Sequence, residues 1–344
     1  MFDPAQFDVA AWGEAVRYLA EVPYDVARPR LYTAHELFDA RNPANPADCL
    51  DARVARHVAA TGANYPEAVE MWARALHDHH IRKAMYAFLG GFDRAAVVGV
   101  MGGHALLRTD ADYRRVVTLA QRLTERGRLM IGGGGPGAME ATHLGAWLAG
   151  RGPADVDAAL ARLAQVPGHG GADWLASAFD VRARFPRVGN AVSLAVPTWH
   201  FPDEPSTPFA THIAKFFENS IREDVLLSEA YGGIVFMPGG AGTFQEVFQE
   251  AMQNHYLTRG CASPMVFVGR RFWTEGCPST RSWRAWLRRG ATGTSRFPSW
   301  RVWTGRWRRS GSDAPRFGLF SAPVSRILPP IFLSAARMCF GPSI

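Results

Sequence analysis

The stretch Gly132-Gly133-Gly134-Gly135-Pro136-Gly137-Ala138-Met139-Glu140 decides how this sequence folds. A short apolar run at 128–131 precedes it, and a helical pattern at 138–148 follows it. Glycine allows a sharp turn from a buried strand into a helix and lets an anion approach the backbone closely. The first N–H groups of the helix are unpaired and lie at the positive end of its dipole, which favours phosphate. The stretch therefore predicts a phosphate-binding turn, although a tight turn without a ligand is the alternative. It is not a Walker A loop, because no Gly-Lys-Ser/Thr follows.

Strands and helices alternate on both sides of this turn. Continuous apolar runs predict buried strands at 95–101, 128–131, 191–196, 233–237 and 265–268. Apolar residues at three- and four-residue spacing predict helices at 111–126, 138–148, 209–230 and 243–256. This order is typical of an α/β Rossmann-like fold with a doubly wound parallel sheet.

A helical extension precedes this alternating region, with helices expected at 9–19, 53–60 and 66–88. We therefore divide the chain into an N-terminal helical region (1–90), a nucleotide-binding domain (91–275) and a C-terminal tail (276–344). The run His77-Asp78-His79-His80 offers two ligands three residues apart, which is too few for a metal site, and a polar helix face is the better interpretation. We expect no metal.

A second glycine turn, Pro238-Gly239-Gly240-Ala241-Gly242-Thr243-Phe244-Gln245-Glu246, again joins a strand to a helix. It repeats the features of a phosphate site and adds the hydroxyl of Thr243. The sequence alone also allows a plain capping box, in which Glu246 folds back onto the Thr243 N–H.

The two turns, in this order and on this frame, resemble those of the LOG family. That family includes cytokinin-activating phosphoribohydrolases and related bacterial nucleotide nucleosidases, and the resemblance covers about residues 94–270. It implies hydrolysis of a nucleoside 5′-monophosphate, such as AMP or a cytokinin nucleotide, to free base and ribose 5-phosphate. It also implies a homodimer or larger homo-oligomer and no cofactor.

Residue roles follow from this resemblance. Glu246 would stabilise the positive charge that develops at C1′ and orient the attacking water. Arg222 matches the family's arginine and would bind phosphate or ribose oxygens, or hold Glu246 ionised; without the family it reads as a solvated helix residue. The residues expected to bind phosphate or nucleotide are Gly133, Gly134, Gly135, Gly137, Met139, Glu140, Gly239, Gly240, Gly242 and Thr243.

Several points stay open at this level. Glu140 is either a second carboxylate of the site or a first-turn residue that complements its helix dipole. The proline-rich segment 201–208 is either a loop over the site or a plain connection. A non-catalytic nucleotide sensor is the alternative function. Lys83 and Lys215, the only lysines, do not stand in the context of a pyridoxal-phosphate decarboxylase.

The composition argues against a general affinity for nucleic acid. The net charge is +7, but residues 276–344 hold twelve arginines and one acid, Asp313, so the rest of the chain is mildly acidic. This tail shows no helical or strand period, which favours translation in a shifted reading frame and poor order over an arginine- and tryptophan-rich nucleic-acid arm. Four scattered cysteines, no signal peptide and no long apolar run predict a cytoplasmic protein that does not span a membrane.

Overall fold

The computed structural model of the chain describes residues 9–38, 48–64, 66–169, 171–201, 204–273 and 301–302. The N-terminal helices are α1 (Val9–Glu21), α2 (Ala34–Phe38), α3 (Leu50–Thr61) and α4 (Ala68–Leu89). The strands are β1 (Val97–Met101), β2 (Leu129–Gly132), β3 (Ser193–Ala195), β4 (His212–Ile213), β5 (Ile234–Phe236), β6 (Met265–Phe267) and β7 (Arg301–Val302). The helices between them are α5 (Ala111–Glu125), α6 (Ala138–Trp147), α7 (Pro153–Leu163), α8 (Ala172–Arg184), α9 (Asn219–Ser228) and α10 (Ala241–Tyr256).

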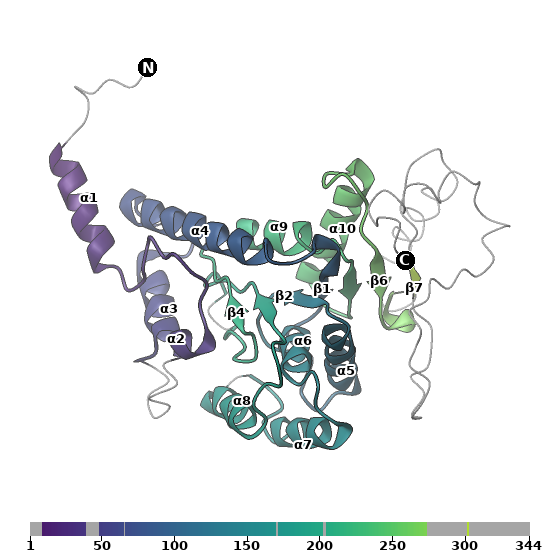
Figure 1. Cartoon of the computed structure of the whole chain (residues 1–344). Coiled ribbons are helices and arrows are strands. Elements are labelled where there is room, and N and C mark those ends of the chain that lie inside the picture. Colours follow the sequence, from purple (N-terminus) through teal and green to yellow (C-terminus); the bar gives the residue numbers. More distant parts are fainter. Residues whose placement is uncertain are drawn as a thin grey trace.

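All strands lie in one parallel sheet in the order β4-β3-β2-β1-β5-β6-β7. The chain enters the sheet at β1, adds β2, β3 and β4 outward on one side, and then returns to place β5 on the other side of β1 (Figure 1). This reversal makes the sheet doubly wound and confirms the predicted Rossmann-like α/β fold. Ligands of such sheets bind outside the carboxyl ends of the strands where the order reverses, which here is between β1 and β5.

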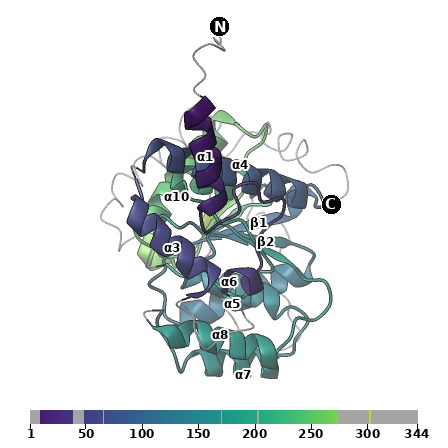
Figure 2. The same cartoon turned by 90° about the vertical axis from the view of Figure 1, so that its left-hand side faces the viewer.

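Helices cover both faces of the sheet because successive strand residues point to opposite sides. In β1, Val97 and Met101 belong to one hydrophobic cluster, while Val98 and Val100 belong to the other. Helices α4 and α9 lie over the first face, and α5 and α6 lie over the second, with α7 and α8 beyond them (Figures 1 and 2). The segment 151–188, for which the sequence predicted no element, therefore supplies an outer helical layer.

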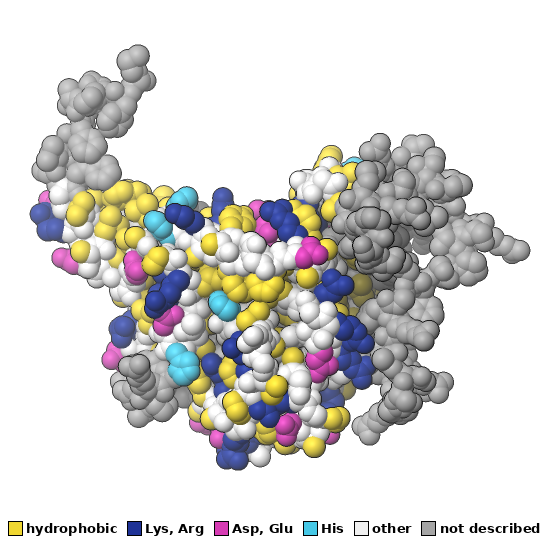
Figure 3. Space-filling view, in the orientation of Figure 1, with side chains coloured by type: hydrophobic (Ala, Val, Ile, Leu, Met, Phe, Trp, Pro, Cys, Tyr) yellow, Lys and Arg dark blue, Asp and Glu magenta, His cyan; other side chains and the backbone are white. Residues whose placement is uncertain are grey.

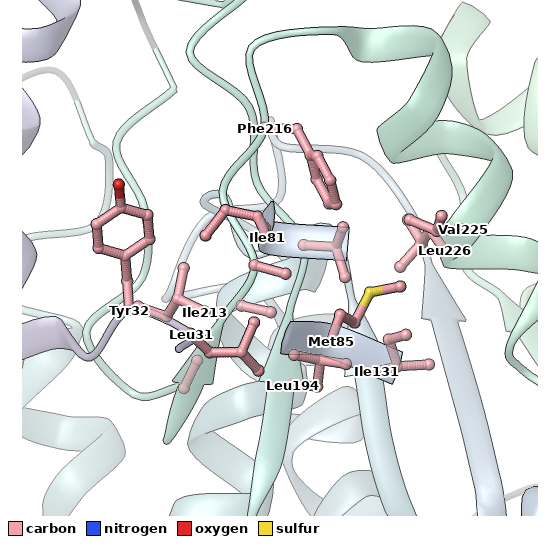
Figure 4. Packing of buried hydrophobic residues seen from close by; sticks show 14 of the residues in the cluster. Leu31, Tyr32, Ile81, Met85, Ile131, Leu194, Ile213, Phe216, Val225 and Leu226 are labelled. Carbon is pink, nitrogen blue, oxygen red and sulfur yellow. The ribbon is translucent and has the colours of Figure 1, made fainter. Parts of the chain in front are cut away.

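The N-terminal helices share the core of the sheet. Ile81 and Met85 of α4 are fully buried and pack in the same cluster as Ile131 of β2, Leu194 of β3 and Leu226 of α9 (Figure 4). The helical region therefore forms a layer of the fold. The division of the whole chain into three parts stays a prediction.

The single helix expected at 209–230 is wrong. Its first half continues the sheet, because the N–H groups of Ala214 and Phe216 donate to Ala195 O and Pro197 O at 2.8 and 3.0 Å. Only α9 is helical. The apolar residues of 209–217 are buried, and hydrophobic period alone does not separate a buried strand from a buried helix.

Two residues of the tail reach the sheet, where Arg301 and Val302 of β7 pair in parallel with Val266 and Phe267 of β6. The remainder of the tail lies outside the described residues, so the expectations about it stay predictions. In the described part of the chain, no helix is both long and apolar enough to span a membrane. Basic and acidic side chains are interspersed on the face shown in Figure 3.

Candidate functional site

The second glycine turn is open to solvent. Helix α10 begins at Ala241, so its first, unpaired N–H groups lie directly after Gly240. Gly240 and Gly242 are exposed, and a Cβ atom at either position would have no heavy atom of the described residues within 4 Å. Gly239 instead packs tightly, since a Cβ there would lie 2.9 Å from Gly103 N. The turn thus offers accessible backbone donors at the carboxyl end of β5, next to β1.

Thr243 and Glu246 both lie inside α10. Thr243 is the third residue of the helix, so it is not the N-cap residue, and a capping box between Thr243 and Glu246 is excluded. Both side chains are buried, with 5% and 7% of their surfaces exposed. A buried carboxyl group that does not cap its helix needs another explanation.

Arg222 of α9 contacts the end of β3, helix α6 and its own neighbour in α9. Its Nε donates to Val196 O at 3.0 Å, just after β3, and its Nη1 donates to Glu223. Its Nη2 lies 3.9 Å from Met139 Sδ on α6. The guanidinium is buried, so the solvated helix face that the sequence also allowed does not apply.

The pKa of Glu246 is raised to about 8. Burial is the largest cause, and the negative charges of Glu223 and Glu204 add to it, while Arg222 acts in the opposite direction. The neutral form therefore predominates at pH 7. Arg222 favours the ionised carboxylate, as expected, but burial outweighs it.

The first glycine turn is fully buried and filled by protein atoms. A Cβ at Gly133 would overlap Arg222 and Met139, and one at Gly137 would lie 2.5 Å from Gly103 O. The N–H of Ala138, at the start of α6, already donates to Gly103 O at 3.2 Å. These glycines allow the chain after β1 to cover the start of α6.

Gly134 and Gly135 have similar surroundings. Gly134 has a φ of +74°, and a Cβ there would lie 2.7 Å from Ala195 Cβ, while one at Gly135 would lie 2.8 Å from Met139 Cε. In this conformation the first turn exposes no phosphate site, which differs from the expectation.

Glu140 contributes to the fold and is not brought to Glu246. It is completely buried, and its carboxylate accepts from Arg108 Nε at 2.9 Å and from Tyr113 OH at 2.8 Å. Arg108 donates to it a second time through Nη2. Both oxygens are engaged, which contradicts the expected role of Glu140 in nucleotide binding.

Two acids near Glu246 were missed by the sequence analysis. Glu223 directly follows Arg222 and is buried, and its Oε2 has no hydrogen-bond partner among the described residues. Glu204 lies in the proline-rich segment, with Oε1 2.9 Å from His104 Nδ1. A few residues later, Thr207 N donates to Gly134 O at 2.7 Å. This segment therefore lies over the first turn. Of the two interpretations that its proline-rich composition allowed, the contacts favour a loop over the first turn.

Other candidates are accounted for inside the fold. Lys215 is buried, with Nζ 2.6 Å from Asp51 Oδ1, in an extended segment and not in mid-helix. His77 and Asp78 are also buried, so they do not form the polar helix face that was expected. In the residues that the structure describes, no group of three or more His, Cys, Asp or Glu side chains could hold a metal ion.

Comparisons with known proteins add little to this geometry. No family model matches the chain, and no curated protein matches it. Among solved structures, the chain is similar to the X-ray structure of TM1055, a structural genomics target, with a TM-score of 0.32 and 17% identity. The match covers 52% of this chain and 74% of that one.

Proposed function

We propose that this protein hydrolyses the N-glycosidic bond of a nucleoside 5′-monophosphate, such as AMP or a cytokinin nucleotide, and that it belongs to the LOG family. One observation carries the proposal: α10 starts at an exposed glycine turn and bears a buried carboxyl group, Glu246, less than two helical turns further on. An α-helix rises about 5.4 Å per turn, so this spacing suits the distance from a 5′-phosphate to the anomeric carbon of the same ribose.

The phosphate would bind at Gly240 and Gly242, where unpaired N–H groups and the helix dipole favour an anion. The ribose would then extend along α10 toward Glu246. Arg222 and Glu223 lie on the neighbouring helix and bring opposite charges close to the same carboxyl group. In this arrangement the second turn binds the phosphate, and the first turn serves to hold the surrounding chain.

The reaction breaks the bond between C1′ and the base nitrogen and forms a bond from C1′ to a water oxygen. Positive charge develops at C1′ in the transition state, and the ionised carboxylate of Glu246 would stabilise it in a site with little water. The water loses one proton, and the base leaves with one. Because burial raises the pKa of Glu246, the carboxylate form becomes abundant only above neutral pH.

A panel of nucleoside 5′-monophosphates, assayed for free base and ribose 5-phosphate, tests this function. We expect release of base from at least one monophosphate and much slower release from the matching nucleoside, which lacks the phosphate group. Tight binding of a monophosphate without release of base would favour the alternative, a nucleotide sensor. Light scattering tests the accompanying expectation of a homodimer or larger homo-oligomer.

A further inference from the structure

The N-terminal helices hold the segment that leads into α9. Asp78 of α4 has only 2% of its surface exposed, and its carboxylate accepts hydrogen bonds from the N–H groups of Phe217 and Glu218, each at 2.9 Å. His77 Nδ1 lies 3.0 Å from the same carboxylate. A buried acid with several donors is held in one orientation.

Asp51 of α3 provides a second anchor two residues earlier in that segment. Its Oδ1 lies 2.6 Å from Lys215 Nζ and accepts from Trp199 Nε1 at 2.8 Å. Lys215 also donates to Ser206 Oγ at 2.9 Å. Two carboxylates from two N-terminal helices thus bind this segment, Asp51 at the Lys215 side chain and Asp78 at the backbone N–H groups of Phe217 and Glu218.

These anchors act directly on the start of α9. Glu218, whose N–H is held by Asp78, is the N-cap residue of α9 and accepts from Ser220 N at 3.2 Å. The carbonyl of Glu218 accepts from Arg222 N at 3.2 Å, which closes the first turn of the helix. Arg222 and Glu223, the charges that act on Glu246, are therefore one helical turn from the anchored backbone.

Packing reinforces the connection. Ile81 and Met85, which follow Asp78 on α4, pack with Val225 and Leu226 of α9 in one buried cluster (Figure 4). Helix α4 thus reaches the segment before α9 through the Asp78 side chain, and it shares a buried apolar cluster with α9 itself.

We infer that Asp78, supported by Asp51, is a positioning residue for the site: it fixes the start of α9 and so sets where the Arg222–Glu223 pair stands relative to Glu246. The N-terminal helical region would then help to position the charged residues of the site. The inference about position depends only on the structure, whereas its effect on turnover rests on the proposed function.

The test compares Asp78→Asn with Glu70→Gln in the full-length protein. Glu70 is a matched control on the same helix: it is 1% exposed and accepts from Tyr18 OH at 2.8 Å and from Arg74 Nε at 2.6 Å. Its partner Arg74 lies over the Phe217 ring, but in the described part of the chain Glu70 makes no hydrogen bond to residues 215–218. Both variants replace a buried acid by its amide and should lower the melting temperature. Only Asp78→Asn should alter the site.

The first measurement is the pKa of Glu246, followed by carbon-13 NMR of glutamate carboxyl groups and assigned with Glu246→Gln. We expect Asp78→Asn to shift it by about half a pH unit or more, because the nearby charges move, and Glu70→Gln to leave it unchanged. The second is kinetic: for Asp78→Asn, kcat should fall about 10-fold or more with KM within about threefold, since small misplacements in a site are costly.

An unchanged pKa of Glu246 in Asp78→Asn, or equal shifts in both variants, would overturn the inference. If no monophosphate is hydrolysed by the parent protein, the proposed function fails, but the pKa measurement still decides the positioning role. Should Asp78→Asn not fold, Asp51→Asn at the second anchor takes its place with the same expectation.

Discussion

Replacing Glu246 by Gln should make the protein more stable while making it less active. In the folded protein the pKa of this carboxyl is about 8, against an ordinary value of 4.5. Between these two values the folded state holds one more proton than the unfolded chain. Stability therefore falls as the pH rises through this window, by about 1.4 kcal/mol per pH unit at the steepest.

The loss accumulates to about 3 kcal/mol by pH 7 and is under about 1 kcal/mol at pH 5. Glutamine has nearly the shape of the neutral acid and does not titrate, so Glu246→Gln escapes this loss. The stability gained by the variant should be about 2 kcal/mol larger at pH 7 than at pH 5.

Guanidinium unfolding of both proteins at the two pH values measures this difference, and Asp224→Asn, an exposed acid on α9, serves as the control. Turnover of the variant should drop about 10²-fold or more, with a much smaller effect on nucleotide binding. A stability difference that is the same at pH 5 and pH 7 would refute the reasoning about burial. Near-normal release of base would remove Glu246 from the chemistry.

Three further predictions concern the two glycine turns, Glu140 and the pH dependence of base release. Gly134→Val should prevent stable folding, because φ at this position is +74° and the surrounding space is filled. Gly240→Val should fold normally and lose monophosphate binding. If Gly240→Val binds monophosphate as tightly as the parent protein, the second turn is not the phosphate site. Glu140→Gln should lower the free energy of unfolding by about 3 kcal/mol in a denaturation experiment, because it breaks a buried ion pair with Arg108. Turnover should change less than about twofold. A large loss of turnover at normal stability would restore Glu140 to the site. The rate of base release should rise about 10-fold from pH 6 to 7 and level off above pH 8, because it follows the ionisation of Glu246. A rate that falls over this range would mean that the neutral form of Glu246 is the active one.

Local pattern predicted most of the sheet but not the path around β4. Buried strands such as β1 and β5 show as continuous apolar runs between turns, and α5 and α10 show as periodic ones. Most residues of 209–217, which contain β4, are apolar and buried, and the period of so short a run does not separate a strand from a helix.

The site was predictable in its residue types and not in its accessibility. Both glycine turns stand out in the sequence, where they look equivalent, whereas only the resemblance to the LOG family singles out Glu246 and Arg222. Gly103 O covers the start of α6, whereas none of the described residues covers Gly240. This difference depends on Gly103, about 35 residues before α6 in the chain. The pKa of Glu246 likewise depends on burial and on the charges of Glu223 and Glu204, which come from α9 and from the proline-rich segment.

The two anchors of α9 also determine when the site can form during folding. The hydrogen bond between Asp51 and Lys215 spans 164 residues of chain, and that between Asp78 and Phe217 spans 139. Closing such long loops costs entropy before any contact compensates for it, so contacts of this range form late. A folding intermediate in which β1, β2, α5 and α6 have already assembled would still lack a correctly placed Arg222. During synthesis Asp51 and Asp78 therefore stay without these partners until the strands up to β4 have been made.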